Sequence, residues 1–135
     1  MIRQLDDKTL VAGQLTPADV PGLKDQGVTL LVNNRPDNED ADQPLSAEFE
    51  AAARAAGIEY RHIPIRYGMG PSDVESMRAA LHATGDGKLL AFCRSGNRST
   101  LAWAVARAED GAEPDELRRC AEAAGFSLGP VAHLL

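Results

Sequence analysis

Residues 89–99 read Leu89-Leu90-Ala91-Phe92-Cys93-Arg94-Ser95-Gly96-Asn97-Arg98-Ser99. An apolar run of this kind is typical of a buried strand, and here it leads into a cysteine, a short glycine-containing loop and a helical pattern over 99–108. The N–H groups of such a loop and of the first helical turn point inward, and the helix dipole adds partial positive charge. Because this field favours a thiolate, we expect Cys93 to be a nucleophile.

Two arginines distinguish this loop from a purely structural turn. A cysteine at the end of a buried strand is usually a small inert hydrophobe, and Gly, Ser and Asn often only form a turn. Arg94 and Arg98 both follow Cys93 within five residues, on a loop too short to direct both away from the thiol. We therefore predict that Cys93 and Arg98 are catalytic, although Ser99 could simply cap its helix. The bound anion would be held by Arg94, Ser95, Gly96, Asn97 and Ser99.

Length, charge and cysteine content limit the possible classes of protein. A chain of 135 residues is expected to form a single domain, 1–135, and its net charge of −6 argues against nucleic-acid and membrane-surface partners. No apolar stretch is long enough to span a bilayer, and residues 1–7 lack the apolar core of a signal peptide. Two cysteines, one of them in a loop that favours a thiolate, suggest a reducing cytoplasm. No cofactor or metal is expected, because the histidines lack metal-ligand spacing with the cysteines.

Short apolar runs alternate with amphipathic stretches along the chain. We predict strands over 9–12, 28–33, 59–65 and 88–92, and helices over 16–26, 47–56, 72–82, 99–108 and 114–124. Ser46 and Ser72 would cap two of these helices, Ser72 together with Glu75 as a capping box, and the final ten residues are expected to pack loosely. Strands separated by helices favour an α/β fold, with three α/β/α layers around a mostly parallel sheet of four to five strands.

In a parallel sheet, ligands bind beyond the carboxyl ends of the strands. Arg35 follows the second predicted strand, Arg66 the third, and Arg94 and Arg98 the fourth. The sequence therefore predicts that an acidic protein gathers arginines at one rim around Cys93. The expected partner is a small anionic substrate, and Arg35 is a further candidate to bind it.

The loop from Cys93 to Arg98 resembles the active-site loop of the rhodanese sulfurtransferases, in which Cys-Arg-x-Gly-x-Arg/Thr is common. In that family the cysteine accepts a sulfane sulfur as a persulfide, and the loop amides cradle it. Protein tyrosine phosphatases use a related loop with five residues between cysteine and arginine, usually with a histidine before the cysteine. Here four residues separate Cys93 from Arg98, Phe92 occupies the position of that histidine, and Ser99 that of the phosphatase arginine.

Other segments resemble the opening of dual-specificity phosphatase domains: Leu10-Val11-Ala12-Gly13-Gln14, 27–36, and Tyr60-Arg61-His62-Ile63-Pro64-Ile65. The Gly-His-Ile-x-Gly-Ala segment typical of rhodaneses is absent. Together with Leu101-Ala102-Trp103-Ala104, these segments resemble a small bacterial phosphatase-like family related to the N-terminal domain of beta-lactamase hydrolase-like proteins, over nearly the whole chain. The resemblance implies a protein tyrosine phosphatase-like fold. Some members of this family are described as phosphatases and others as sulfurtransferases.

The two activities differ in their need for a general acid. A phosphatase usually carries an aspartate on the loop after the third strand, but residues 66–71 contain no carboxylate, and Asp73 is expected only to favour the dipole of its helix. Sulfur transfer needs no such acid, because a sulfane donor such as thiosulfate brings its own leaving group. The leading prediction is therefore a sulfurtransferase that forms a covalent intermediate on Cys93 and passes sulfur to a thiol acceptor, with Arg98 holding the donor.

Two alternatives stay open. One is a cysteine-based phosphatase that hydrolyses phosphomonoesters, and the other is an inactive module that binds oxyanions or phosphorylated partners. Cys120 could act as a resolving thiol, but a helical cysteine beside an alanine-rich face is more often part of the core.

Overall fold

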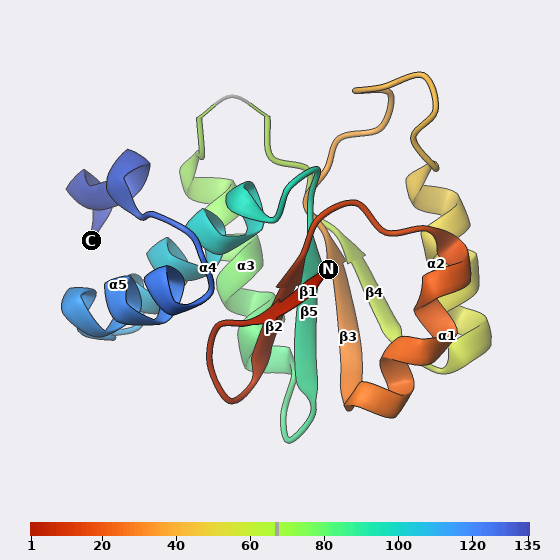
Figure 1. The fold of residues 1–135 in the computed structure, drawn as a ribbon, viewed down its shortest axis with the longest axis horizontal. Coiled ribbons are helices and arrows are strands. Elements are labelled where there is room, and N and C mark those ends of the chain that lie inside the picture. The colour runs from red at the N-terminus through yellow and green to blue at the C-terminus, as the bar shows by residue number, and fades with distance from the viewer. Residues whose placement is uncertain (67) are drawn as a thin grey trace.

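The computed structural model describes residues 1–66 and 68–135, which build a five-stranded sheet with helices on both faces (Figure 1). The strands are β1 (Ile2–Gln4), β2 (Thr9–Ala12), β3 (Val28–Asn33), β4 (Glu59–His62) and β5 (Lys88–Phe92). Their order across the sheet is β1-β2-β5-β3-β4, and only β1 runs antiparallel to its neighbour. The predicted mostly parallel α/β sheet is confirmed, with β5 and its cysteine at the centre.

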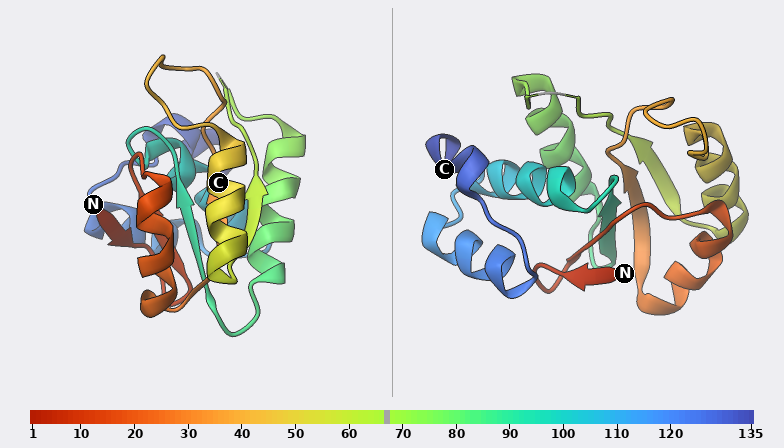
Figure 2. Two further views of the ribbon diagram at one scale, coloured as in Figure 1. Left: turned by 90° about the vertical axis from the view of Figure 1, so that its right-hand side faces the viewer. Right: turned by 45° about the horizontal axis from the view of Figure 1, so that its top comes forward.

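Helices cover the two faces of the sheet unequally. The short helix α1 (Val20–Leu23), flanked by 3₁₀ turns over 17–19 and 24–26, lies with α2 (Ser46–Ala56) on one face. The other face carries α3 (Pro71–Ala83), α4 (Asn97–Glu109), α5 (Pro114–Ala123) and the 3₁₀ segment Gly129–Leu134. The right-hand view of Figure 2 shows these two groups separated by the sheet, which gives the three predicted layers.

The pleat of β5 explains why both faces are covered. Alternate residues of a strand point to opposite faces. Leu89 and Ala91 join the core under α3 and α4, whereas Leu90 and Phe92 join the core under α1 and α2. A run of apolar residues is therefore stable only if helices bury both sides of this strand, and that burial fixes the position of the cysteine at its end.

The two ends of the chain differ from the sequence analysis. The strand β1, a fifth strand for which no residues were predicted, pairs along β2 with Arg3 opposite Val11. The last ten residues do not pack loosely, because Leu128 and Val131 are buried in the same core as α4. Apolar side chains spaced three apart in a 3₁₀ turn face one side, and that pattern is too short to stand out in the sequence.

Four further expectations about element boundaries and helix caps need correction. The helix α2 begins at Ser46, so Ser46 does not cap it; Glu48 instead accepts a hydrogen bond from the amide of Leu45. The helix α3 begins at Pro71, and Asp73 accepts from the amide of Gly70, so the Ser72 and Glu75 box does not form. The strand β4 ends at His62 rather than at residue 65, and α4 begins at Asn97, so Ser99 lies within this helix and does not cap it.

The carboxyl ends of β3, β4 and β5 lie at one edge of the sheet. The loop after β5, the segment 34–45 after β3 and residues 63–66 after β4 lie together at this edge, towards the top of Figure 1. Within the described residues, every helix is too short or too polar to cross a membrane.

Candidate active site

The thiol of Cys93 lies at the head of α4. Cys93 directly follows β5 and is only 1% exposed, and its Sγ accepts a hydrogen bond of 3.1 Å from the amide of Gly96. Gly96 is the residue before the first turn of α4, so the sulfur lies where the N–H groups of a 13-residue helix begin. A helix start is positive, and this arrangement stabilises negative charge on a sulfur or on a bound oxyanion.

The backbone of Gly96 gives the loop its shape. This residue has a φ of +89°, a conformation that residues with a Cβ atom rarely adopt. A Cβ atom there would also lie 3.0 Å from Cζ of Phe126, which belongs to the segment after α5. On the other side, the amide of Gln14 donates to the carbonyl oxygen of Arg94 at 3.1 Å. The loop is therefore held between the end of β2 and the carboxyl-terminal segment.

A buried hydrogen bond links the cysteine helix to the neighbouring strand. Ser99 Oγ donates to Oδ1 of Asn34 at 2.8 Å, and both residues are fully buried. The amide nitrogen Nδ2 of Asn34 donates in turn to the carbonyl oxygen of Ile63 at 3.0 Å. Asn34 therefore joins three segments at the carboxyl edge, and Ser99 contributes to the packing of the site.

Arg98 is held in place by a carboxylate. Its Nη1 and Nη2 donate to the two carboxylate oxygens of Glu39 at 2.7 and 2.9 Å, and Nη1 also donates to the carbonyl oxygen of Ile65 at 2.9 Å. The hydrogen bond to Glu39 raises the pKa of Arg98 above its ordinary value, and the nearby Cys93 sulfur adds to that shift. The guanidinium is thus permanently charged and lies beside the thiol.

Arg35 is buried within the loop after β3. Its three nitrogens donate to Glu39, Gln14 and Asp40, at 2.9, 2.8 and 2.7 Å respectively. With its donors shared among these partners and a side-chain exposure of 4%, Arg35 braces the loop that carries Glu39. The paired residue Glu39 also contacts Arg98, so one carboxylate connects both arginines.

A hollow of about 520 Å³ opens beside Arg98. It is lined by four arginines, two carboxylates and an asparagine: Arg35, Arg66, Arg94, Arg98, Asp37, Glu39 and Asn38. The predicted gathering of arginines at this rim is therefore present in the structure. Ser95 and Asn97, also predicted to bind the anion, are exposed, and the Ser95 hydroxyl accepts a hydrogen bond from the Asn97 amide.

Neither of two carboxylates near the site is placed to act as a general acid. Asp73 uses Oδ2 to accept a hydrogen bond from the Gly70 amide at 2.9 Å, so it caps α3, a role that was not predicted. Hydrogen bonds from Arg98, and secondly from Arg35, lower the pKa of Glu39 to about 2. A carboxyl group with that pKa carries no proton to donate near neutral pH.

Glu39 is a residue of the site that the sequence did not reveal. Segment 34–44 is polar and acidic, a composition typical of a solvated surface loop. Arg35 and Glu39 are four residues apart, a spacing that suggests a pair only in a helix, and this loop is not helical. The ion pair of Glu39 with Arg98 joins residues 59 positions apart, so no local sequence pattern indicates it.

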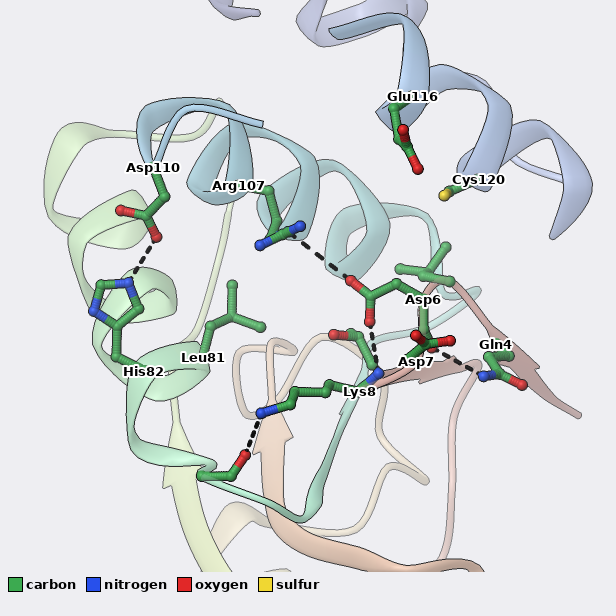
Figure 3. A pocket seen from close by; sticks show the side chains of 13 residues that line it. Gln4, Asp6, Asp7, Lys8, Leu81, His82, Arg107, Asp110, Glu116 and Cys120 are labelled. Atoms are coloured by element: carbon green, nitrogen blue, oxygen red, sulfur yellow. Dashed lines mark hydrogen bonds and ion pairs between the residues drawn. The ribbon is translucent and has the colours of Figure 1, made fainter. Parts of the chain in front are cut away.

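A second and larger hollow, of about 1120 Å³, lies at the opposite edge of the sheet (Figure 3). It is lined by residues before β2 and at the ends of α3 and α4, and by Cys120 of α5. Partial burial raises the pKa of the Cys120 thiol above its ordinary value, which makes it a poor nucleophile. Across residues 1–66 and 68–135, no group of three or more His, Cys, Asp and Glu side chains is placed to hold a metal ion.

Solved structures share this architecture. A candidate phosphatase from Neisseria meningitidis is 34% identical and superposes with a TM-score of 0.82, covering 98% of this chain and 95% of that one. TpbA from P. aeruginosa, solved with phosphotyrosine, is 17% identical with a TM-score of 0.63, covering 88% and 70%, and shows likeness of fold alone. The Neisseria structure supports a phosphatase-like protein, and neither neighbour lends support to the predicted sulfurtransferase.

Sequence relatives agree with this result. The beta-lactamase hydrolase-like protein of Xylella fastidiosa is 31% identical over 130 residues, which cover 95% of this chain. The chain spans about 30% of the length of that curated relative. Residues 1–110 match the family described as beta-lactamase hydrolase-like protein, phosphatase-like domain. The chain therefore belongs to the phosphatase-like domain family of the beta-lactamase hydrolase-like proteins.

Proposed function

We propose that this protein hydrolyses phosphomonoesters through a covalent phosphocysteine on Cys93. The observation that carries the proposal is the position of the buried Cys93 sulfur at the head of α4. The sulfur accepts a hydrogen bond of 3.1 Å from the Gly96 amide and lies beside Arg98. The candidate phosphatase from Neisseria meningitidis and the phosphotyrosine held by TpbA support a phosphoester as the substrate.

In the first step, the thiolate of Cys93 attacks the phosphorus atom of the substrate. A sulfur–phosphorus bond forms as the ester phosphorus–oxygen bond breaks, and the leaving oxygen takes its proton from solvent. Loop amides such as that of Gly96 and the guanidinium of Arg98 would neutralise the phosphoryl oxygens, where charge is concentrated during the transfer. Glu39 orients Arg98 for this task through its two hydrogen bonds.

In the second step, a water molecule attacks the phosphocysteine. The sulfur–phosphorus bond breaks, inorganic phosphate leaves and the Cys93 thiolate is restored. The same donors serve both steps, because the phosphoryl group stays in the loop while the organic product departs.

The arrangement favours substrates with good leaving groups. Glu39 is ionised and Asp73 caps α3, so neither supplies a proton to the departing oxygen. Aryl phosphates leave as weakly basic phenolates and need little protonation, whereas alkyl phosphates need more. We therefore propose aryl phosphates as the preferred class.

Phosphate release from phenyl phosphate by the reduced protein tests the proposal. The native protein and a Cys120→Ser variant should turn over at the same rate, and Cys93→Ser should be inactive. Equal release by Cys93→Ser would overturn the assignment of the nucleophile. If phosphate binds but no variant releases product, the site acts as a binding module for oxyanions.

Sulfur transfer is the second candidate, favoured by the four residues between Cys93 and Arg98. A shorter loop closes more tightly round the sulfur and leaves less room for a tetrahedral phosphate. In this reaction the Cys93 thiolate attacks the outer sulfur of thiosulfate, sulfite leaves, and the resulting persulfide passes its sulfur to an acceptor thiolate. Cyanide can replace the acceptor thiol, and it then leaves as thiocyanate.

A further inference from the structure

We infer that the arginine-lined hollow beside Arg98 binds a second anionic group of the substrate, through Arg66 and Arg94. The substrate class is thus a phosphomonoester whose organic part carries another phosphate or a carboxylate. This inference rests on the proposed function, because it assumes that the reacting phosphoryl group occupies the cysteine loop.

The pairing of the arginines that line the hollow separates them into two groups. Arg35 and Arg98 are already matched by carboxylates, Arg35 by Glu39 and Asp40 and Arg98 by Glu39. Arg66 and Arg94 are exposed, and among residues 1–66 and 68–135 neither forms an ion pair or a side-chain hydrogen bond. Their charge is thus available to a ligand.

The charge of this hollow contrasts with that of the chain. Four arginines and two carboxylates line it, in a protein whose net charge is −6. Elsewhere, exposed arginines such as Arg54 and Arg119 lie within ion-pair distance of a glutamate. An excess of arginine in one concave site attracts anions and favours carboxylate or phosphate groups, which match the guanidinium fork.

The size of the hollow argues for more than one oxyanion. Its volume of about 520 Å³ falls within the roughly 300–1,000 Å³ typical of pockets for small organic molecules. Arg98 borders both this hollow and the cysteine loop, so a ligand that spans them would place its phosphoryl group at Cys93 and its organic part beside Arg66 and Arg94. An anionic substituent on that organic part would meet the guanidinium groups of Arg66 and Arg94.

Binding to the Cys93→Ser protein tests the inference without turnover. The probes are phenyl phosphate, 4-carboxyphenyl phosphate and benzene-1,4-diol bisphosphate, titrated by calorimetry at one fixed low salt concentration. At least one of the two probes with an extra anion should bind about tenfold more tightly than phenyl phosphate. Arg66→Gln and Arg94→Gln should each reduce that preference to about threefold or less, since each removes one partner of the second anion.

Arg119→Gln is the matched control, because Arg119 is an exposed arginine on α5 and its loss changes the net charge equally. It should leave the preference unchanged. Preference for the bisphosphate alone or for the carboxylate alone identifies the second group. Equal affinity for all three probes, or an equal loss of preference in Arg119→Gln, would overturn the inference.

The proposed function is checked separately, by phosphate release from phenyl phosphate with the native protein. Absence of release together with a retained preference would reject the phosphatase and keep the second anion site. Phosphate release without any preference among the three probes would keep the phosphatase and reject the second anion site.

Discussion

Glu39 binds the guanidinium of Arg98 with both carboxylate oxygens, at 2.7 and 2.9 Å, although the two residues are 59 positions apart. The same carboxylate accepts from Nε of Arg35 at 2.9 Å. The loop after β3 therefore orients a charged side chain of the cysteine loop, and the site depends on the contact between these two loops.

Stability should depend on pH through Glu39. Its pKa is lowered from 4.5 to about 2, so the ionised form favours folding above about pH 4.5, and that contribution is lost as the pH falls towards 2. Because the pair is partly open to solvent, we expect a loss of about 1–2 kcal/mol across this window. Urea unfolding at several pH values should detect this loss in the native protein and a smaller one in Glu39→Gln. Identical pH profiles for the two proteins would contradict this account.

Removing the Ser99 hydroxyl should destabilise the fold. Ser99→Ala leaves the buried Oδ1 of Asn34 without its donor, at a cost of about 1–3 kcal/mol. The exposed Ser76→Ala variant on α3 is the matched control and should change the free energy of unfolding by less than about 0.5 kcal/mol. Chemical denaturation of both variants measures the difference, and equal values would mean that the Ser99–Asn34 bond contributes little.

Gly96→Ala should lower the stability of the fold more than Gly111→Ala does. The new Cβ atom would meet Phe126 at 3.0 Å, whereas at Gly111, with a similar φ of +95°, no heavy atom lies within 4 Å of that position. Both variants carry a backbone strain of about 1 kcal/mol, so the excess loss in Gly96→Ala reports the contact with Phe126. Adding Phe126→Ala to Gly96→Ala should remove part of that excess, as measured by a double-mutant cycle in thermal unfolding. A fully additive cycle would show that the two residues are not coupled.

Rates should depend strongly on the leaving group. Because neither Glu39 nor Asp73 supplies a proton to the leaving oxygen, alkyl phosphates should react on the order of a hundredfold more slowly than aryl phosphates, which steady-state kinetics can compare directly. Asp73→Asn should leave the ratio of the two rates unchanged, because Asp73 caps α3. A selective loss of activity on alkyl phosphates in this variant would identify Asp73 as the acid.

The cysteine loop and the sheet were the most predictable parts of the molecule. The apolar run before Cys93, the arginines after it and the helical pattern beyond are local signals, and they specify β5, the loop and α4. Glu39 could not be identified as a site residue, because its role comes from a contact with Arg98, which is distant in the sequence. The packing of Leu128 and Val131 was missed for a related reason: two apolar residues near a terminus carry no periodicity that a sequence pattern can detect.

Intact-mass measurement of the reduced protein, quenched during turnover of phenyl phosphate, tests the covalent phosphocysteine most directly. The account predicts a mass gain of one phosphoryl group in the native protein, which disappears when substrate is exhausted, and no gain in Cys93→Ser. A parallel sample exposed to thiosulfate tests the second candidate. No phosphoryl gain, together with the gain of one sulfur that cyanide removes, would contradict the phosphatase and establish sulfur transfer at Cys93.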